Sequence, residues 1–351
     1  MSRVHLVGAI LAAGVAGYYI GRKINIIVKQ RQKGIINNNS KDDESVEDTD
    51  THSLVQSYYA NAANGSGSSC CGSNNSAPVN AERSEKMGYT TSELELVKEA
   101  NLGVGCGSPI TFANIRKNET VVDLGSGLGI DCLLAAEHVG RGGNVIGVDM
   151  TREMIDKARK IIKKKKIKNI EYRLGEIEHL PLANNSVDCV ISNCVINLSP
   201  EKEKVYKDIL RVLKPGSGRI AISDVVKFLP DDLPQHLKTD QALACWVTGA
   251  LSAQETKTML EDIGFVNINM DIKHESRSYI KDWLPGSNAE DYVVSANISA
   301  FKPFPLMEST SQKQPRQIER LNFKIQPVTT NASSKDSCCK VQKNGEKNNK
   351  W

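Results

Sequence analysis

The stretch that decides the fold is Val121-Val122-Asp123-Leu124-Gly125-Ser126-Gly127-Leu128-Gly129, an apolar run followed by glycines at alternate positions. The apolar run predicts a strand buried on both faces. Residues 130–139 then follow a helical pattern. Glycines at a strand-to-helix turn let the backbone approach a ligand closely, and the N-terminus of the helix offers N–H groups that the helix itself leaves unpaired. The stretch therefore predicts a ligand-binding turn.

Two carboxylates indicate the kind of ligand. A dinucleotide-binding turn would follow G-x-G-x-x-G, but here Ile130 occupies the place of the third glycine. Asp123 precedes the turn, where a carboxylate suits a positively charged ligand better than a pyrophosphate. Asp149 ends the next predicted strand, at a distance that suits a ribose diol. These features resemble the class I S-adenosylmethionine methyltransferases; a nicotinamide cofactor and a tight turn without a ligand are the alternatives.

Composition excludes other classes of function. The chain has 351 residues, enough for one large domain or two small ones. Its net charge of +4 and its 5% aromatic content argue against nucleic acid as a partner. It has nine cysteines, an odd number, without a zinc-binding spacing such as C-x-x-C. Most lie in or beside predicted core elements, which favours reduced thiols in a cytosolic enzyme over a secreted disulfide framework.

An apolar segment at the N-terminus suggests a membrane anchor. Residues 4–20 are apolar apart from His5, and basic residues flank them. Their length is at the lower limit for spanning a bilayer. Further basic residues between 29 and 33 favour the C-terminal side as cytosolic. We therefore expect a cytosol-facing, membrane-anchored protein, with a mitochondrial presequence or a secretory signal peptide as alternatives.

The chain divides into segments of different composition. We expect five, which are a membrane anchor or targeting segment at 1–25, a flexible linker at 26–85, a cofactor-binding domain at 86–225, a substrate region at 226–302 and a disordered tail at 303–351. The linker contains the vicinal pair Cys70-Cys71, and the tail contains Cys338-Cys339. A vicinal pair in a polar loop has no packing role. It suits redox chemistry or a thiophilic ion.

From residue 119 onward the chain alternates between strand and helix patterns. Strands are predicted at 120–124, 144–148, 170–174, 187–192 and 219–223, with helices at 130–139, 152–166 and 201–213 between them. Such repeats predict an α/β fold with a doubly wound, mostly parallel, Rossmann-like sheet. Late strands at 265–272 and 292–301 would close the sheet as an antiparallel pair in a small C-terminal α+β region.

Other helices and one common edge complete the predicted architecture. Helices are expected at 53–61, 91–100 (capped by Ser92), 237–251 and 253–263, and one is expected to run to about Ile115. Ligands bind at the carboxyl ends of parallel strands. The topology therefore brings together the glycine turn, Asp149, Glu176, Asn193 and Cys194.

The end of the fourth predicted strand indicates the substrate. Cys194 lies there between Asn193 and Asn197, without a histidine or an evident proton-abstracting pair. An oxygen acceptor of a methyl group would ordinarily need a general base. A soft acceptor that carries a lone pair and is held by thiolates would not.

The sequence around three cysteines resembles the arsenite methyltransferase family. The resemblance runs from about residue 55 to about residue 301. It is carried by Gly103-Val104-Gly105-Cys106-Gly107, Asp123 to Cys132, Gly147 to Thr151, Gly175 to Glu178, Ser192-Asn193-Cys194-Val195-Ile196-Asn197-Leu198-Ser199-Pro200 and Cys245-Trp246-Val247-Thr248-Gly249-Ala250-Leu251. An expected Pro-Gly-Gly turn is Pro215-Gly216-Ser217-Gly218 here, a small departure.

The resemblance implies a function in arsenic detoxification, the methylation of trivalent arsenic. Arsenic would bind the thiolates of Cys106, Cys194 and Cys245, and Cys70 or Cys71, near Tyr58-Tyr59, would take part in redox chemistry and arsenic capture. The expected contacts with S-adenosylmethionine are Asp123, Gly125, Ser126, Gly127, Gly129, Asp149, Met150, Glu176, Ile177 and Asn193. The expected partners are arsenite and methylated arsenicals as thiol conjugates, with thioredoxin or glutathione as reductant, and the chain is expected to be a monomer.

Two other functions remain open. A methyltransferase for an organic small molecule, such as a quinone or sterol precursor, would share the cofactor site and give the cysteines no role. A non-catalytic, membrane-tethered protein that sequesters arsenic or a metal would use the vicinal cysteines and need no S-adenosylmethionine. Cys189 is expected in the core. Cys132 is expected to pack there as well, although a disulfide with a later cysteine is an alternative.

Overall fold

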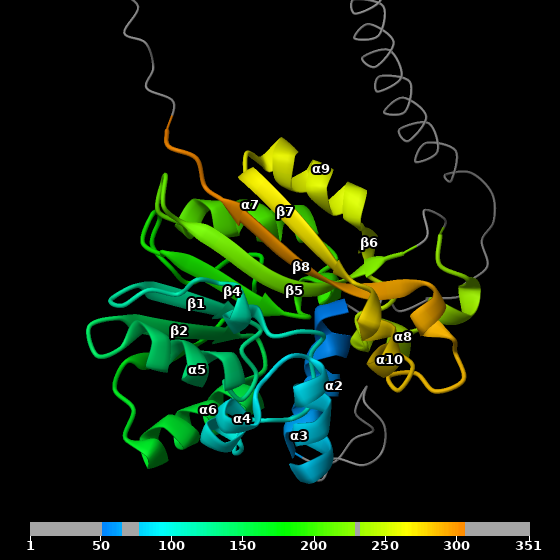
Figure 1. The fold of residues 1–351 in the computed structure, drawn as a ribbon, viewed down its shortest axis with the longest axis horizontal. Coiled ribbons are helices and arrows are strands. Elements are labelled where there is room, and N and C mark those ends of the chain that lie inside the picture. Colours follow the sequence, from blue (N-terminus) through cyan, green and yellow to red (C-terminus); the bar gives the residue numbers. More distant parts are fainter. Residues whose placement is uncertain (1–50, 65–76, 229–231, 306–351) are drawn as a thin grey trace, which may run out of the picture. The chain divides into compact units, whose positions relative to one another are not determined.

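The computed structural model describes residues 51–64, 77–228 and 232–305, and within them one mixed sheet organises the chain (Figure 1). Its strand order is β3-β2-β1-β4-β5-β8-β7, and β6 pairs with β5 off this path. The strands are β1 (Thr120–Leu124), β2 (Asn144–Asp149), β3 (Ile170–Leu174), β4 (Cys189–Asn193), β5 (Arg219–Lys227), β6 (Leu251–Ser252), β7 (Val266–Lys273) and β8 (Val293–Phe301).

Helices cover both faces of this sheet (Figure 1). They are α2 (Thr51–Asn64), α3 (Ala77–Lys86), α4 (Thr91–Val97), α5 (Ile130–Val139), α6 (Arg152–Lys165), α7 (Lys202–Val212), α8 (Asp240–Ala244), α9 (Ala253–Ile263) and α10 (Arg277–Ile280). Val121 of β1 packs with side chains of α4, α5 and α6, whereas its neighbour Val122 packs with those of α7 and α9. Successive strand residues thus bury opposite faces, and the doubly wound fold is confirmed.

The parallel core and its antiparallel edge both follow the prediction. β1 lies between β2 and β4, all three parallel, with Val122 opposite Ile146 on one side and Val190 on the other. β8 runs antiparallel to β5, and β7 runs antiparallel to β8. β5 continues to Lys227 because β8 pairs with it along its full length. The predicted boundary at residue 225 therefore falls inside a strand.

Several local predictions were wrong. The helix expected at 237–251 is only α8, because Trp246 adopts a left-handed backbone with φ of 64° and the chain turns there. The helix expected to run to Ile115 is a short 3-10 turn, Pro109–Thr111. The cap of α4 is Thr90, not Ser92, because the Thr90 hydroxyl accepts the Glu93 N–H and the Glu93 carboxylate accepts the Thr90 N–H. Within the expected linker, residues 77–86 form α3.

Helix α2 packs against two regions that are far apart in the chain. It contacts α6, which follows the cofactor strand β2, and α8 in the C-terminal region. Val55 is buried in a cluster that also contains Trp246, Tyr279 and Trp283. The Tyr59 hydroxyl donates a hydrogen bond to the Ala244 carbonyl at 3.2 Å. α2 therefore packs against both α6 and the C-terminal helix α8.

The prediction of a membrane-anchored protein is contradicted. No helix in residues 51–64, 77–228 and 232–305 is long and apolar enough to cross a membrane. The longest of them, α2 and α6, have 14 residues each, whereas a spanning helix needs about 20. Residues 4–20, to which the anchor was assigned, and the predicted tail from residue 306 onward lie outside the described residues.

Candidate active site

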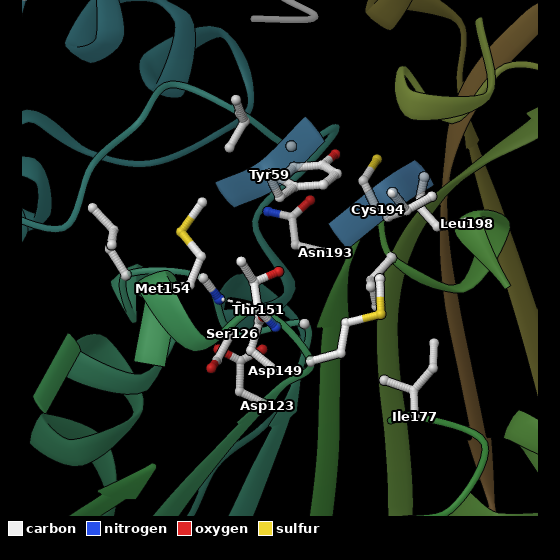
Figure 2. A pocket seen from close by; sticks show the side chains of 18 of the residues that line it. Tyr59, Asp123, Ser126, Asp149, Thr151, Met154, Ile177, Asn193, Cys194 and Leu198 are labelled. Carbon is white, nitrogen blue, oxygen red and sulfur yellow. Dashed lines mark hydrogen bonds between the residues drawn. The ribbon is translucent and has the colours of Figure 1, made fainter. Parts of the chain in front are cut away.

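A cavity opens at the carboxyl ends of β1, β2 and β4 (Figure 2). The cavity is partly open to solvent. Its wall includes eight of the ten residues expected to contact the cofactor, namely Asp123, Gly125, Ser126, Gly127, Asp149, Met150, Ile177 and Asn193. The topology therefore brings together most of the residues expected to bind the cofactor.

The glycine turn requires its glycines for two different reasons. Gly127 and Gly129 have φ of 52° and 91°, a left-handed backbone that other residues rarely adopt. A Cβ on Gly129 would lie 1.8 Å from the Tyr172 hydroxyl oxygen, so this glycine permits close packing and does not line the cavity. A Cβ on Gly127 would meet nothing within 4 Å. Gly127 therefore leaves room for a ligand at the cavity wall.

Asp149 fixes this turn and faces the cavity. One of its carboxylate oxygens accepts the Gly127 N–H at 2.9 Å, and the other accepts the Thr151 N–H at 2.8 Å. Burial raises the pKa of Asp149, and these two N–H donors partly oppose the rise. Each oxygen keeps a further lone pair. A buried carboxylate held in this way, beside a glycine cradle that no side chain fills, fits the ribose of S-adenosylmethionine.

Two further buried carboxylates line the same cavity. Burial and the neighbouring Asp131 raise the pKa of Asp123 well above its usual value, and the Cys132 thiol donates to it at 3.3 Å. Burial raises the pKa of Asp131 to about 7, while the Tyr89 hydroxyl, 2.9 Å away, opposes the rise. Such a group of acids suits a cationic ligand. The sequence analysis missed Asp131, because an acid in the first turn of a helix ordinarily only complements the helix dipole.

Asn193 connects the cavity to the loop that carries Cys106. Its side-chain oxygen accepts the Cys106 N–H at 3.0 Å, and its amide donates to the Gly107 carbonyl at 2.6 Å and to the Tyr89 hydroxyl at 3.0 Å. A Cβ on Gly105 would lie 2.9 Å from this amide group, so the loop depends on glycine to approach it. Asn193 therefore positions the Cys106 loop relative to the cofactor cavity.

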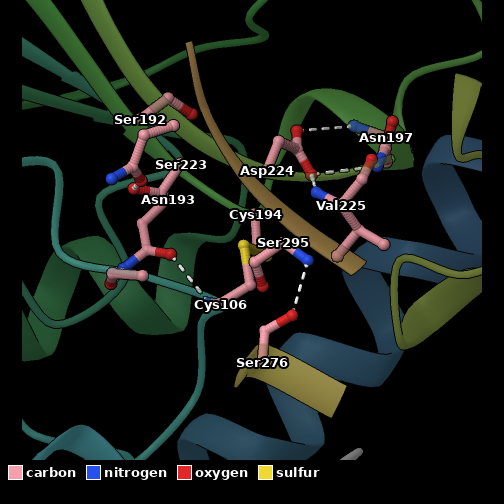
Figure 3. The surroundings of a disulfide bond; sticks show 12 residues. Cys106, Ser192, Asn193, Cys194, Asn197, Ser223, Asp224, Val225, Ser276 and Ser295 are labelled. Carbon is pink, nitrogen blue, oxygen red and sulfur yellow. Dashed lines mark hydrogen bonds between the residues drawn. A yellow bond between two sulfur atoms is a disulfide. The ribbon is translucent and has the colours of Figure 1, made fainter. Parts of the chain in front are cut away.

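Cys106 and Cys194 form a disulfide beside this cavity (Figure 3). They are 88 residues apart in sequence, and their Cα atoms are 5.9 Å apart. Cys194 follows β4 with a left-handed φ of 57° and lines the cavity. The expectation of reduced thiols is therefore wrong for this pair. The fold brings together these cysteines because the Cys106 loop packs on the carboxyl ends of the strands.

The other cysteines occupy different positions. Cys245 is buried at the end of α8, in the cluster of buried side chains that also contains Cys106 and Cys194. Cys132, on α5, and Cys189, within β4, are both buried in the core, where Cys189 was predicted. Cys70, Cys71, Cys338 and Cys339 lie outside the described residues.

The loop after β3 faces the cavity with Ile177, as expected, but with Glu178 rather than the expected Glu176. Glu176 is exposed and does not line the cavity, whereas Ile177 and Glu178 do. The buried Glu178 carboxylate is 3.1 Å from the His52 ring nitrogen and also accepts the Ser199 hydroxyl. His52 comes from α2 and lines the cavity too. This contact links α2 to the cofactor side of the cavity.

Asp224 lies close to the disulfide and had no role in the sequence analysis (Figure 3). One oxygen atom of its buried carboxylate and the two sulfur atoms all lie within 4.8 Å of one another. Burial raises the pKa of Asp224 to about 7, although backbone N–H groups and Lys202 oppose the rise. Its only signal in the sequence is its position directly after the predicted strand 219–223.

Comparison with known proteins identifies the family. A family model described as "Methyltransferase domain" matches residues 115–264. The chain is 46% identical over 265 residues to an arsenite methyltransferase of Halobacterium salinarum, which covers 72% of this chain and 67% of that protein. It is 38% identical over 173 residues to the human arsenite methyltransferase, which covers 46% of this chain and 44% of that protein.

A solved structure is also similar. It is an arsenic (III) S-adenosylmethionine methyltransferase from Chlamydomonas reinhardtii, 32% identical, with a TM-score of 0.48 over 64% of this chain and 74% of that one. The match to the halobacterial protein covers two thirds of its length, whereas the match to the human protein covers less than half. The halobacterial match, together with the methyltransferase domain, establishes that this chain belongs to the arsenite methyltransferase family of S-adenosylmethionine-dependent methyltransferases.

Proposed function

We propose that this enzyme transfers methyl groups from S-adenosylmethionine to trivalent arsenic held by the thiolates of Cys106, Cys194 and Cys245. The observation that carries the proposal is that Cys194 lines the cofactor cavity and lies within bonding distance of Cys106. Trivalent arsenic is a soft centre, and soft centres prefer thiolate ligands. Arsenic bound to Cys194 would therefore lie at the wall of the methyl donor's cavity.

The cofactor side of the site has an orienting role. S-adenosylmethionine supplies an electrophilic methyl group on a sulfonium sulfur. In our proposal Asp149 holds the ribose hydroxyls, and the carboxylates of Asp123 and Asp131 face the positive charge. Holding two reactants in line removes most of the entropic cost of their encounter. Asn193 binds the Cys106 loop. It would therefore keep the bound arsenic aligned with the methyl group of S-adenosylmethionine.

The thiols have a chemical role beyond binding. The lone pair of trivalent arsenic accepts the methyl group, so no side chain has to remove a proton. Arsenic then becomes formally pentavalent. It returns to the trivalent state when two of its thiolate ligands leave together as a disulfide, which supplies the two electrons. A disulfide between Cys106 and Cys194, as in this structure, is the expected protein product of that step.

An external thiol has to reduce this disulfide before the next transfer. Thioredoxin and glutathione are the reductants we propose, because thiolate–disulfide exchange with either would regenerate both cysteines. Cys70 or Cys71 would assist by relaying electrons or by capturing arsenic. Arsenite and methylated arsenicals would arrive as thiol conjugates. A monomeric state remains a prediction.

The decisive experiment follows the arsenic species directly. The full chain is incubated with S-adenosylmethionine, arsenite and a thiol reductant, and the products are separated by speciation chromatography. We expect methylated arsenic from the native chain and none from Cys194→Ser, which should still bind the cofactor. Cys189→Ala is the matched control, because Cys189 is buried within β4 and does not line the cavity.

Two outcomes would contradict this proposal in different ways. Methylated arsenic from Cys194→Ser at the native rate would remove the assigned thiol site. Absence of product from the native chain, with cofactor binding intact, would remove arsenic as the substrate. An organic methyl acceptor, such as a quinone, would then be the next substrate to test.

A further inference from the structure

One cluster in the described part of the chain combines two sulfur atoms with a carboxylate. Its members are Cys106, Cys194 and Asp224, all buried (Figure 3). The arsenic chemistry proposed above uses sulfur ligands only, because a soft centre prefers a third thiolate to an oxygen. That chemistry therefore gives the Asp224 carboxylate no role.

The surroundings of Asp224 hold its carboxylate in a fixed orientation. One oxygen accepts the Val225 N–H at 2.7 Å and the Asn197 side-chain amide at 2.9 Å. The other accepts the Asn197 backbone N–H at the longer distance of 3.3 Å. Each carboxylate oxygen offers two lone pairs, and the second oxygen makes the longest of these hydrogen bonds. Carboxylates that bind metal ions are oriented by hydrogen bonds of this kind.

The charge of the cluster favours a cation. Two thiolates and a carboxylate would place three negative charges in a buried space, which is costly unless positive charge compensates them. The nearby Lys202 ammonium compensates part of the Asp224 charge, but its hydrogen bonds go to the Ser199 carbonyl at 2.7 Å and the Asn197 carbonyl at 3.3 Å rather than to the cluster. A divalent ion with affinity for both sulfur and oxygen would satisfy the three donors. Zn²⁺ has this preference.

We propose that the reduced protein binds a borderline divalent cation, Zn²⁺, through Cys106, Cys194 and Asp224. Binding involves no electron transfer, since each thiol releases its proton to solvent as its sulfur bonds to the metal. The fourth position of a tetrahedral ion is left to a water molecule. The Cα atoms of the two cysteines, 5.9 Å apart, allow both sulfurs to reach one ion at about 2.3 Å.

This site would regulate the enzyme. Zinc would occupy the same two thiolates that we propose as arsenic ligands, so it would compete with arsenic and prevent the disulfide from forming. This regulatory part rests on the proposed function. Binding of the metal itself does not, because it requires neither arsenic nor S-adenosylmethionine.

The test uses Co²⁺ as a spectroscopic probe of zinc sites. The full chain is reduced with a phosphine, freed of metal with a chelator and titrated with Co²⁺, and sulfur-to-cobalt charge-transfer absorption is recorded. Zn²⁺ is then added to displace the cobalt. The vicinal cysteines could also bind cobalt, so the titration is repeated on a chain in which Cys70, Cys71, Cys338 and Cys339 are serine.

Asp224→Asn separates the proposed site from simple binding by thiols. It keeps the shape of the side chain and both thiols but removes the charged oxygen ligand. Loss of a residue that only orients a ligand already costs about 10–100-fold in metal affinity, so we expect Co²⁺ to bind more than about 10-fold more weakly. Cys194→Ser should lose the charge-transfer band. Asp208→Asn, which changes a carboxylate on α7 outside the cluster, is the matched control and should bind as the native chain does. Cofactor binding and circular dichroism report whether each variant folds.

The outcomes decide between the parts of the proposal. Equal Co²⁺ affinity in Asp224→Asn and the native chain would overturn it, as would absence of the band in the chain without vicinal cysteines. If Asp224→Asn fails to fold, Asp224→Ser replaces it, because serine also lacks the carboxylate, and a Co²⁺ affinity equal to that of the native chain would likewise overturn the proposal. Zn²⁺ should then inhibit arsenite methylation competitively with arsenite. Methylation that fails in the absence of metal would count against the proposed function alone.

Discussion

The cofactor end and the thiol end of the active site are built in different ways. Most of the cofactor end comes from one continuous stretch, residues 120–151, in which the Gly127 N–H of the glycine turn donates to the Asp149 carboxylate, while Ile177 and Asn193 complete the cavity wall. The thiol end is assembled from residues far apart in the chain, Cys106, Cys194 and Asp224, which the Asn193 and Asn197 side chains hold in place. Local sequence thus determines the structure of the cofactor end, whereas tertiary packing determines that of the thiol end. Substitutions should therefore affect one end without the other.

The largest effect should come from the thiol end. Cys106→Ser removes a proposed arsenic ligand, and we expect methylation of arsenite to fall below detection in the speciation assay. Affinity for S-adenosylmethionine, measured by calorimetry, should stay unchanged, because Cys106 does not line the cofactor cavity. A variant that loses both methylation and affinity for S-adenosylmethionine would show that the cofactor end and the thiol end depend on each other.

The glycine turn offers the next largest effect. Gly129→Ala places a Cβ against the Tyr172 hydroxyl and forces a left-handed backbone on alanine. We expect the free energy of unfolding to fall by about 2–4 kcal/mol. Gly127→Ala is the matched variant, since its Cβ meets no neighbour, and should lose only about 1–2 kcal/mol. Urea denaturation measures both. Equal losses would mean that packing against Tyr172 does not matter.

Asp149→Asn tests the cofactor end alone. The variant keeps the size of the side chain but loses a charged acceptor, which is worth about 1.5–3 kcal/mol. We expect S-adenosylmethionine to bind about 10–100-fold more weakly in calorimetry, with arsenite binding to the reduced thiols unaltered. Asp156→Asn, at an exposed position on α6, is the control. Unchanged cofactor affinity would remove the assignment of the ribose to Asp149.

The smallest predicted effect is on the link between the two ends. Tyr89→Phe removes the hydroxyl that donates to Asp131 and accepts from Asn193. The raised pKa of Asp131, about 7, means that the folded protein takes up a proton that the unfolded chain has released. This uptake makes stability fall as pH rises from about 4 to 7. The lost hydrogen bond stabilises the carboxylate, so Tyr89→Phe should raise this pKa further.

The variant should accordingly be less stable by about 1 kcal/mol above pH 7, where Asp131 is ionised in the native protein. The difference should shrink at pH 5, where the carboxyl is protonated. Urea denaturation at the two pH values measures this. A destabilisation that is the same at both would show that Tyr89 acts by packing alone.

Sequence reasoning succeeded where short-range pattern decides the structure. β1, α5, β3 and α9 have the predicted bounds, because buried runs, glycines and helix caps act within a few residues. The positions of Asp123 and Asp149 at the cavity wall follow from the same short-range pattern. The bounds of α8 were not predicted correctly, because the left-handed backbone at Trp246 arises where the chain packs against Trp283 and α2. No pattern in the sequence encodes that contact.

The thiol end could be predicted only through family resemblance. Nothing in the spacing of Cys106 and Cys194 indicates that they touch, and Asp224 gave no signal beyond its place after a strand. In the loop after β3 we predicted Glu176 as a contact, but the path of the loop turns Glu178 toward the cavity instead. Residues of this kind depend on how distant loops meet.

The disulfide has a consequence for the unfolded chain. It closes a covalent ring from residue 106 to residue 194, which encloses β1 to β4 and the whole glycine turn. A ring of this length lowers the entropy of the denatured chain, an effect of roughly 4–5 kcal/mol in the simplest treatment. The oxidised enzyme should thus resist heat better than the reduced one, although both share one fold. Each catalytic round would leave the enzyme in its oxidised form, which is the more resistant to thermal unfolding. The reductant that restores activity would also lower the thermal stability of the enzyme.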